Sequence, residues 1–413
     1  MNEKNSYRGV ASSKDSLSKP FLLLAGVSGT GKTQFVKKQA PEKNYCLIPV
    51  RPDWHEPSDL LGYVSRIGSD GPRYVPTPVL KFMCRAWLAA IVSASSNEYA
   101  LSEPLENIPP FWLCLDEMNL APVEQYFADY LSVLETREWK DKSYTCTPLL
   151  KADTFATLDD GGRDQLKKDL GLDGTDPLQA GLWEYILNKG IPIPPNLIVA
   201  GTVNMDETTH GFSRKGIDRA LTFDFGMFFP NNYSDFFEED RKCSPVTLTF
   251  PVKSHASKDD LLAVGPDRVG DGTSKAIGFL SALKNKLDGT PFEIAYRALN
   301  ELLLFVVCRN PADDMELRAI WDDFMMMKVL PRVEGDRDKL SVGDGADETV
   351  LDRIERVCTK YLDIFWDEGR HRPDLFRVQV SDGLPPPVEC RTRIKLDWMK
   401  KRLTRNGFTS FWP

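Results

Sequence analysis

The sequence predicts an α/β protein with a parallel sheet covered on both faces, followed by a smaller α-helical domain. Two observations support this fold class. Four short segments are apolar throughout, as strands buried on both faces of a parallel sheet are. They alternate with segments of helical apolar spacing, the chain order of strands joined by crossover helices. The predicted strands are residues 21–25, 46–50, 111–115 and 196–202.

The chain divides into four predicted parts. Polar residues 1–19 form a flexible lead-in, and residues 20–240 form the α/β domain. A long segment between two strands, about residues 139–195, is expected as an insertion on the rim of the sheet. Helical spacing after a Gly/Asp-rich linker predicts a helical lid over residues 264–380.

The last part, residues 381–413, is predicted to be a basic C-terminal tail. From Arg391 onward it holds seven Lys and Arg residues against one acid, Asp397. Such a run indicates either a solvated helix face or contact with nucleic acid or a neighbouring subunit, and both interpretations stay open.

Composition limits the function classes. The chain of 413 residues is 42% hydrophobic and 27% charged, which is typical of a globular protein. Its net charge is −8, so any contact with DNA would have to use a local basic patch, a pore or a partner subunit. Eight cysteines form no C-x-x-C pair, so no zinc site is predicted, and Cys114 and Cys308 lie in apolar runs and are expected to be buried thiols. A polar start and the lack of a long apolar run predict a cytoplasmic protein with no membrane contact.

The strongest motif is a phosphate-binding loop between the first strand and a helix that opens at Lys32. Backbone N–H groups of this loop would surround the phosphates, Lys32 would reach the β and γ oxygens, and the Thr33 hydroxyl would ligate Mg²⁺. The strand-loop-helix context disfavours a glycine-rich turn without a nucleotide. The predicted nucleotide-binding residues are Gly26, Val27, Ser28, Gly29, Thr30, Gly31, Lys32 and Thr33.

A second motif is the pair of acids, Asp116 and Glu117, at the end of the third predicted strand. Asp116 would hold the metal ion, and Glu117 would polarise the attacking water. Many strands end in acids, so the pair alone is a weak signal. It becomes strong together with the phosphate-binding loop.

Three segments together resemble the AAA+ motor of McrB, the nucleotide-driven subunit of modification-dependent restriction systems. They are the loop 26–33, Asp116 to Ala121, and Val203 to His210. Residues 50–63 and 328–332 are also similar to that family, and the resemblance spans about residues 20–340. It implies the AAA+ fold, a ring that is usually a hexamer, hydrolysis of GTP with ATP left open, Mg²⁺ as cofactor, and a McrC-like nuclease as partner.

The resemblance also implies roles for three further residues. Asn204, at the end of the fourth strand, would orient the water as sensor 1; the alternative is an asparagine that stabilises a turn. Arg219, or else Arg214, would be an arginine finger toward a neighbour's γ-phosphate, although either could simply pair with a nearby acid. Arg297 would be sensor 2 in the lid, touching the γ-phosphate; the alternative is an arginine on a helix surface.

The sequence departs from the family pattern at two places. Glu207 stands where the family usually has Asp, and the pair or triplet of arginines that often ends the following helix is missing.

Three function classes are weighed. The first is a ring-forming NTPase that moves or remodels DNA for a separate nuclease, because no nuclease constellation is found in this chain. The second is a MoxR-like chaperone that remodels proteins. The third, a nucleotide-gated scaffold with little turnover, is disfavoured because the residues expected for catalysis are all present: Lys32, Thr33, Asp116, Glu117 and Asn204.

Overall fold

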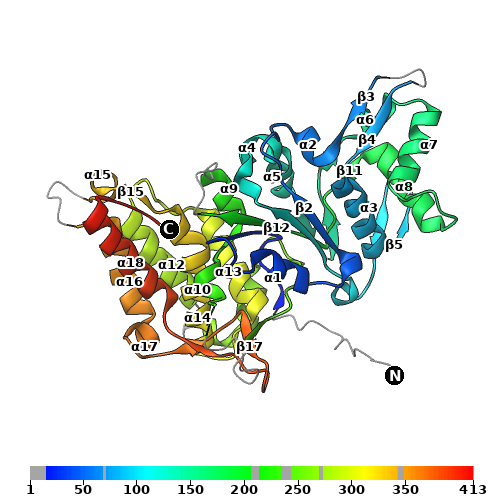
Figure 1. Cartoon of the computed structure of the whole chain (residues 1–413). Helices are drawn as coiled ribbons and strands as arrows, with labels where there is room; N and C mark the ends of the chain where they lie inside the picture. Colours follow the sequence, from blue (N-terminus) through cyan, green and yellow to red (C-terminus); the bar gives the residue numbers. More distant parts are fainter. Residues whose placement is uncertain are drawn as a thin grey trace.

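The structure is a computed structural model of the whole chain. It describes residues 15–67, 71–140, 142–205, 214–231, 233, 243–268, 273–342 and 348–412, and of residues 214 and 215 only the backbone. Figure 1 shows a central sheet with a rim region on one side and a helical region on the other. The rim region includes α3 (Pro78–Ala90), α7 (Asp160–Asp169) and α8 (Pro177–Lys189), and the helical region includes α12 (Lys275–Leu287), α16 (Val350–Tyr361) and α18 (Arg391–Asn406). None of the helices in these described ranges is long and apolar enough to cross a bilayer.

A five-stranded parallel sheet forms the centre of the molecule. Its strands in chain order are β1 (Phe21–Gly26), β2 (Tyr45–Pro49), β7 (Phe111–Asp116), β12 (Leu197–Asn204) and β13 (Leu221–Asp224). Their spatial order is β13-β1-β12-β7-β2, which places the strand of the phosphate-binding loop between the last two strands. This parallel sheet, followed by a helical region, confirms the predicted α/β fold class. The short fifth strand, β13, was not predicted.

Alternate residues of the central strands enter two separate cores. Leu22 and Leu24 of β1 belong to one core, whereas Phe21, Leu23 and Ala25 belong to the other. Side chains of successive strand residues point to opposite faces, so a strand covered on both faces is apolar at every position. Cys114 and Cys308 are buried free thiols, as predicted, and burial raises the pKa of Cys114 to about 12.

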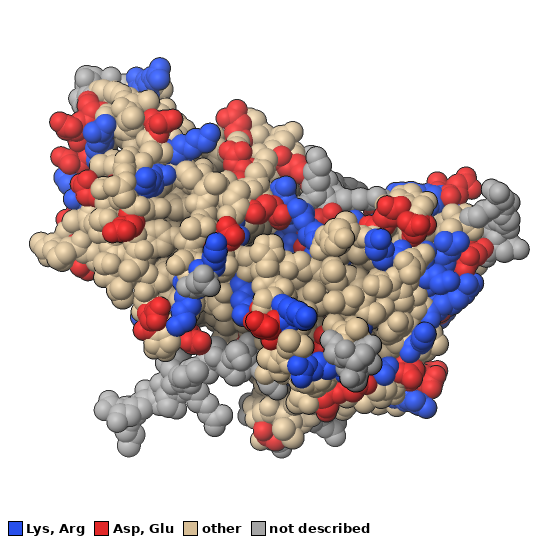
Figure 2. Space-filling model, turned by 180° about the vertical axis from the view of Figure 1, so that it is seen from behind, with Lys and Arg blue, Asp and Glu red and all other residues tan. Residues whose placement is uncertain are grey.

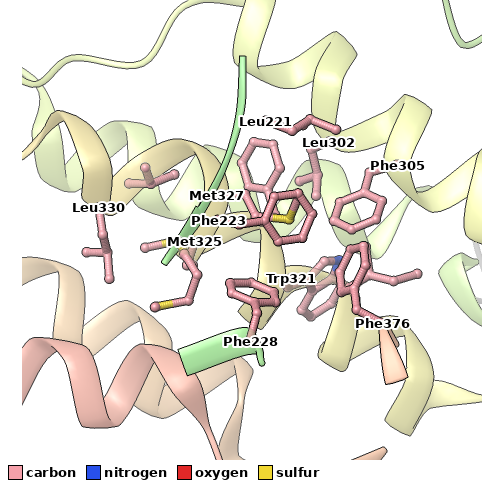
Figure 3. Packing of buried hydrophobic residues seen from close by; sticks show 14 of the residues in the cluster. Leu221, Phe223, Phe228, Leu302, Phe305, Trp321, Met325, Met327, Leu330 and Phe376 are labelled. Atoms are coloured by element: carbon pink, nitrogen blue, oxygen red, sulfur yellow. The ribbon is translucent and has the colours of Figure 1, made fainter. Parts of the chain in front are cut away.

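One core continues from the sheet into the helical region. That region contains α12 (Lys275–Leu287), α13 (Tyr296–Arg309), α14 (Asp314–Phe324), the π-helical turn η8 (Met325–Val329) and α16 (Val350–Tyr361). Figure 3 shows aromatic, leucine and methionine side chains from β13, α10 (Phe225–Phe228), α13, α14 and η8 in contact. Phe223 meets Phe376 edge to face with ring centroids 5.1 Å apart. The helical region is therefore packed directly on β13.

The opposite core holds the rim region. The predicted insertion, about residues 139–195, contains α6 (Ala152–Ala156), α7 (Asp160–Asp169) and α8 (Pro177–Lys189), between the short strands β10 (Pro148–Leu150) and β11 (Ile191–Pro192). The side chains of Trp183 and Ile186 on α8 are buried in the same core as α3 (Pro78–Ala90). The insertion is thus a folded part of the rim (Figure 1).

The C-terminal segment is not a separate tail, which corrects the predicted boundary at residue 380. Residues 391–406 form α18, which packs against α14 and α16, and β19 (Phe408–Ser410) pairs with β15 (Glu334–Asp336). Its basic side chains meet acids from distant parts of the chain. The Arg391 guanidinium lies 2.8 Å from Asp323, and Lys395 lies 2.7 Å from Asp224.

Candidate nucleotide-hydrolysis site

The predicted site residues meet at the carboxyl edge of the sheet. Parallel pairing sets Gly26 beside Asn204, and Pro49 beside Asp116. The phosphate-binding loop, the Asp116-Glu117 pair and Asn204 therefore follow neighbouring strands at one edge, where ligands of open parallel sheets bind.

The phosphate-binding loop has the backbone that its glycines permit. Gly29 and Gly31 have φ values of 78° and 93°, in the left-handed region that residues with a Cβ rarely adopt. Gly31 precedes α1 (Lys32–Lys38) as its N-cap. The Lys32 ammonium is buried and donates to the carbonyl oxygens of Gly26 at 3.0 Å and Val27 at 2.8 Å. In this structure the Lys32 ammonium therefore lies against the backbone of the loop, in the place where a bound phosphate is expected.

Two side-chain oxygens that could ligate a metal ion, those of Thr33 and Asp116, lie close together beside this loop. The Thr33 hydroxyl donates to Asp116 Oδ1 at 2.7 Å. Magnesium binds oxygens at ~2.1 Å in octahedral geometry, so neighbouring ligand oxygens lie about 3 Å apart, and it is usually held by one or two protein groups together with phosphates. The Thr33 and Asp116 pair fits that requirement.

Glu117 is held in an unusual backbone conformation. Its φ of 53° and ψ of 48° are left-handed, which is uncommon for a residue other than glycine and is associated with functional sites. Its N–H donates to Thr202 Oγ1 at 2.9 Å, and its carboxylate accepts from Asn204 Nδ2 at 3.1 Å. The structure therefore joins Glu117 directly to the predicted sensor.

Two residues of this network had no role in the sequence prediction. The Thr202 hydroxyl donates to Asp116 Oδ1 at 2.7 Å while accepting from the Glu117 N–H, so it ties the two acids together. Asn119 Nδ2 donates to the Asn204 carbonyl oxygen at 3.1 Å. The only sequence signal for Thr202 is a hydroxyl in an otherwise apolar central strand.

Arg219 and Arg297 lie at the other edge of the sheet. Arg219 ends α9 (Arg214–Arg219), just before Leu221, which pairs with Leu22 near the start of β1. Both guanidinium groups face one acid: Arg219 Nε is 3.9 Å and Arg297 Nη2 is 2.6 Å from Glu135. The six residues of β1, roughly 20 Å of extended chain, separate this edge from the chain's own phosphate-binding loop.

This arrangement corrects part of the sequence prediction. Arg297 is brought together with Arg219 and not with the chain's own phosphate-binding loop. The sequence also allowed Arg219 to pair with Asp218 or Asp224. Among the described ion pairs, Arg219 instead meets Glu135, whereas Asp218 lies 3.1 Å from Arg332 and Asp224 lies 2.7 Å from Lys395. The Arg214 side chain, and the motif residues Asp206 to His210 with Glu207, lie outside the described residues.

A cavity of about 560 Å³ opens beside the two arginines, between the sheet edge and the helical region. Basic side chains outnumber acids in its wall. The charged lining residues are Lys19, Glu135, Arg137, Arg219, Lys253, Arg297 and Glu301.

Comparison with known proteins assigns no function to this chain. A family model described as a domain of unknown function (DUF8727) matches residues 262–408, which is the helical region including α18. No curated protein matches. One similar solved structure is that of a "putative ATPase" from Cytophaga hutchinsonii, with 13% identity, a TM-score of 0.40, and coverage of 83% of this chain and 84% of that chain. The fold assignment rests on the strand order and not on this similarity.

Proposed function

We propose that this chain is a Mg²⁺-dependent nucleoside triphosphatase of AAA+ type. The observation that carries the proposal is the hydrogen-bonded network at the carboxyl edge of the sheet. It joins Thr33, Asp116, Thr202, Glu117 and Asn204 next to the phosphate-binding loop. A hydroxyl and an acid that can hold Mg²⁺, together with a group that can orient the attacking water, are recurring parts of P-loop nucleotide-hydrolysing sites.

Each side chain of the network has a proposed task. Backbone N–H groups of the loop bind the phosphates, and Lys32 leaves the carbonyls of Gly26 and Val27 to bind the β and γ oxygens. Thr33 and Asp116 would hold Mg²⁺, and the ion would neutralise charge that develops on the phosphates. Glu117 accepts a hydrogen bond from the attacking water, and Asn204 fixes the direction of the Glu117 carboxylate.

We propose further that Arg219 and Arg297 complete the site of a neighbouring subunit. Both lie at the edge away from their own loop and are partly exposed, with 23% and 49% of the side-chain surface accessible. A contact between two different faces of identical subunits closes into a ring when the rotation permits. The ring, expected to be a hexamer, is thus a requirement of this catalytic arrangement.

The finer function follows only from the McrB resemblance. We propose that hydrolysis drives DNA translocation or remodelling for a McrC-like nuclease, with GTP or ATP as substrate. On the face of the molecule in Figure 2, Lys and Arg are interspersed with Asp and Glu, so DNA contact through the ring pore or a partner is favoured over contact on that face. A MoxR-like chaperone is the alternative.

The first test is hydrolysis by two variants. Glu117→Gln should bind nucleotide but hydrolyse it at least ~100-fold more slowly, because the carboxylate that polarises the water is lost. Lys32→Ala should lose nucleotide binding. Glu184→Gln, an exposed acid on α8, is the matched control and should behave as the wild type. Equal turnover by Glu117→Gln and the wild type would refute the proposed site.

The second test addresses substrate and partner. Steady-state hydrolysis of GTP and of ATP is measured with and without DNA, and with any nuclease that purifies with the chain. Stimulation by DNA or by the nuclease supports the restriction motor. A copurified protein substrate and no effect of either addition favour the chaperone.

A further inference from the structure

We infer that Lys328 positions Arg219 by clamping the backbone on both sides of it, and so couples the helical region to the neighbour's catalytic site. This inference rests on the proposed function of Arg219. Lys328 touches neither the phosphate-binding loop nor the acids of the hydrolysis site, so it is a positioning residue and not a catalytic one.

The contacts of Lys328 use its whole donor capacity. Its ammonium donates to the carbonyl oxygens of Asp218 and Ala220, each at 2.8 Å, and lies 2.8 Å from Glu301 Oε2. An ammonium has three N–H donors, and here three acceptors surround it. Two of those acceptors are the backbone carbonyls of the residues immediately before and after Arg219.

Two other basic residues reach the same short segment. Lys19, just before β1, donates to the Asp218 carbonyl oxygen at 3.1 Å and pairs with Glu301. Arg332 Nε lies 3.1 Å from Asp218 Oδ1. The backbone that carries Arg219 is thus fastened from the sheet and from the helical region, while the Arg219 side chain points to the cavity beside Glu135.

The burial of Lys328 and Glu301 indicates that their main role is to fix the backbone around Arg219, and not to stabilise the fold. The Lys328 and Glu301 side chains are only 6% and 4% exposed. Burying an ion pair is costly, and an apolar side chain of similar length is often at least as stabilising. Burial lowers the pKa of Lys328 to about 8, although the nearby Glu301 charge opposes that change. What an apolar residue could not supply is the directed hold on two carbonyl groups.

The helix that bears Lys328 departs from α-helical geometry at this residue. Lys328 lies in η8, a π-helical turn that directly continues α14, and π-helical turns are frequent at functional sites. Neighbouring side chains of η8, Met325 and Met327, lie in the core beside Phe223 of β13 (Figure 3). A shift of the helical region that moves η8 therefore moves the backbone of Arg219 with it.

The test separates the two sides of a subunit interface. Lys328→Met should keep nucleotide affinity within about two-fold, because Lys328 contacts Asp218, Ala220 and Glu301 and not the phosphate-binding loop of its own chain. The same variant should lower kcat at least ~10-fold. Mixing it with Glu117→Gln subunits should restore hydrolysis, since those subunits supply a correctly held Arg219 to the intact site of the Lys328→Met subunit. Lys275→Met removes another ion-paired lysine of the helical region, 2.8 Å from Asp314, and should leave kcat unchanged.

The parallel mixture of Arg219→Ala with Glu117→Gln tests the proposed function by itself. Recovery there but none with Lys328→Met would overturn the clamp and leave the role of Arg219 in place. No recovery in either mixture would overturn both. Thermal melting checks that each variant is folded. If Lys328→Met melts below the assay temperature, Lys328→Met/Glu301→Gln, which removes the buried acid as well, takes its place with the same expected results.

Discussion

Thr202 connects Asp116, proposed to hold the metal ion, with Glu117, proposed to position the attacking water. Its hydroxyl donates to Asp116 and accepts from the backbone N–H of Glu117, whose left-handed conformation needs such support. A threonine in a strand buried on both faces would otherwise have to leave its hydroxyl without a partner, at a cost in free energy. Thr222 in β13, on the other side of β1, is such a case, since its buried hydroxyl has no hydrogen-bond partner among the described residues.

The pair Thr202 and Thr222 gives a matched prediction. Thr202→Val keeps the shape but leaves the Glu117 N–H unsatisfied, a cost of about 1–3 kcal/mol, so kcat should fall roughly 10- to 100-fold. Thr202→Ser keeps the hydroxyl and should therefore retain most of the wild-type kcat. Thr222→Val should leave kcat unchanged. Steady-state hydrolysis with nucleotide binding in parallel decides the matter. A Thr202→Val enzyme with wild-type kcat would show that the hydroxyl has no part in positioning Glu117.

At this scale the sequence predicts residues whose position follows from the end of a strand. Lys32, Asp116, Glu117 and Asn204 each follow an apolar run, and parallel strands bring those ends together. Thr202 could not be recognised, because one hydroxyl inside a strand looks like core. The placement of Arg297 depends on how the helical region packs on the sheet, which no local pattern encodes.

At the scale of elements, α18 shows why the C-terminal segment was predicted wrongly. The number of Lys and Arg residues in α18 does not reveal that acids elsewhere in the chain face them. Arg391, for example, pairs with Asp323 of α14 and with Asp374. Asp322 of α14 is fully buried and accepts from the N–H groups of Arg391 at 3.0 Å and Thr392 at 2.8 Å, at the start of α18. The family model that ends at residue 408 likewise treats α18 and the helical region as one unit.

Asp322 is therefore expected to hold the helical region together. Its carboxylate also lies 2.6 Å from the guanidinium of Arg372, which is buried too. Burial by itself would raise the pKa of Asp322, but Arg372 and the hydrogen bonds from Thr392 keep that pKa below its usual value. Asp322→Ala should lower the free energy of unfolding by about 3–5 kcal/mol, because it removes one of the two acids that pair with the buried Arg372 and leaves the two N–H groups at the start of α18 without their acceptor.

The control for Asp322 is an exposed acid of the same region. Asp363, 63% exposed, pairs with Arg318, and Asp363→Ala should cost less than ~1 kcal/mol. Urea unfolding followed by circular dichroism compares the two variants. Equal stability of both would contradict the structural role of the buried acid.

For the whole molecule, the polarity of the parallel sheet separates the two halves of the proposed shared site. The carboxyl edge carries the phosphate-binding loop and its acids, and the amino edge carries Arg219 and Arg297 about one strand length away. The described part of one chain thus presents both halves of a site but does not bring them together. Neighbouring copies in a closed ring would join them, and Glu135 holds the two arginines until then.

Nucleotide should therefore drive assembly. The Glu117→Gln variant with triphosphate and Mg²⁺ should sediment as a larger species than without nucleotide, because its bound γ-phosphate gives the neighbour's arginines a partner that is not hydrolysed. Lys32→Ala should show no such change, and adding Arg219→Ala to Glu117→Gln should weaken the assembly by at least ~10-fold in the protein concentration required. Analytical ultracentrifugation over a range of concentrations measures this. A Glu117→Gln chain that stays monomeric at saturating nucleotide would rule out the shared site, and a complex unaffected by Arg219→Ala would remove that arginine from it.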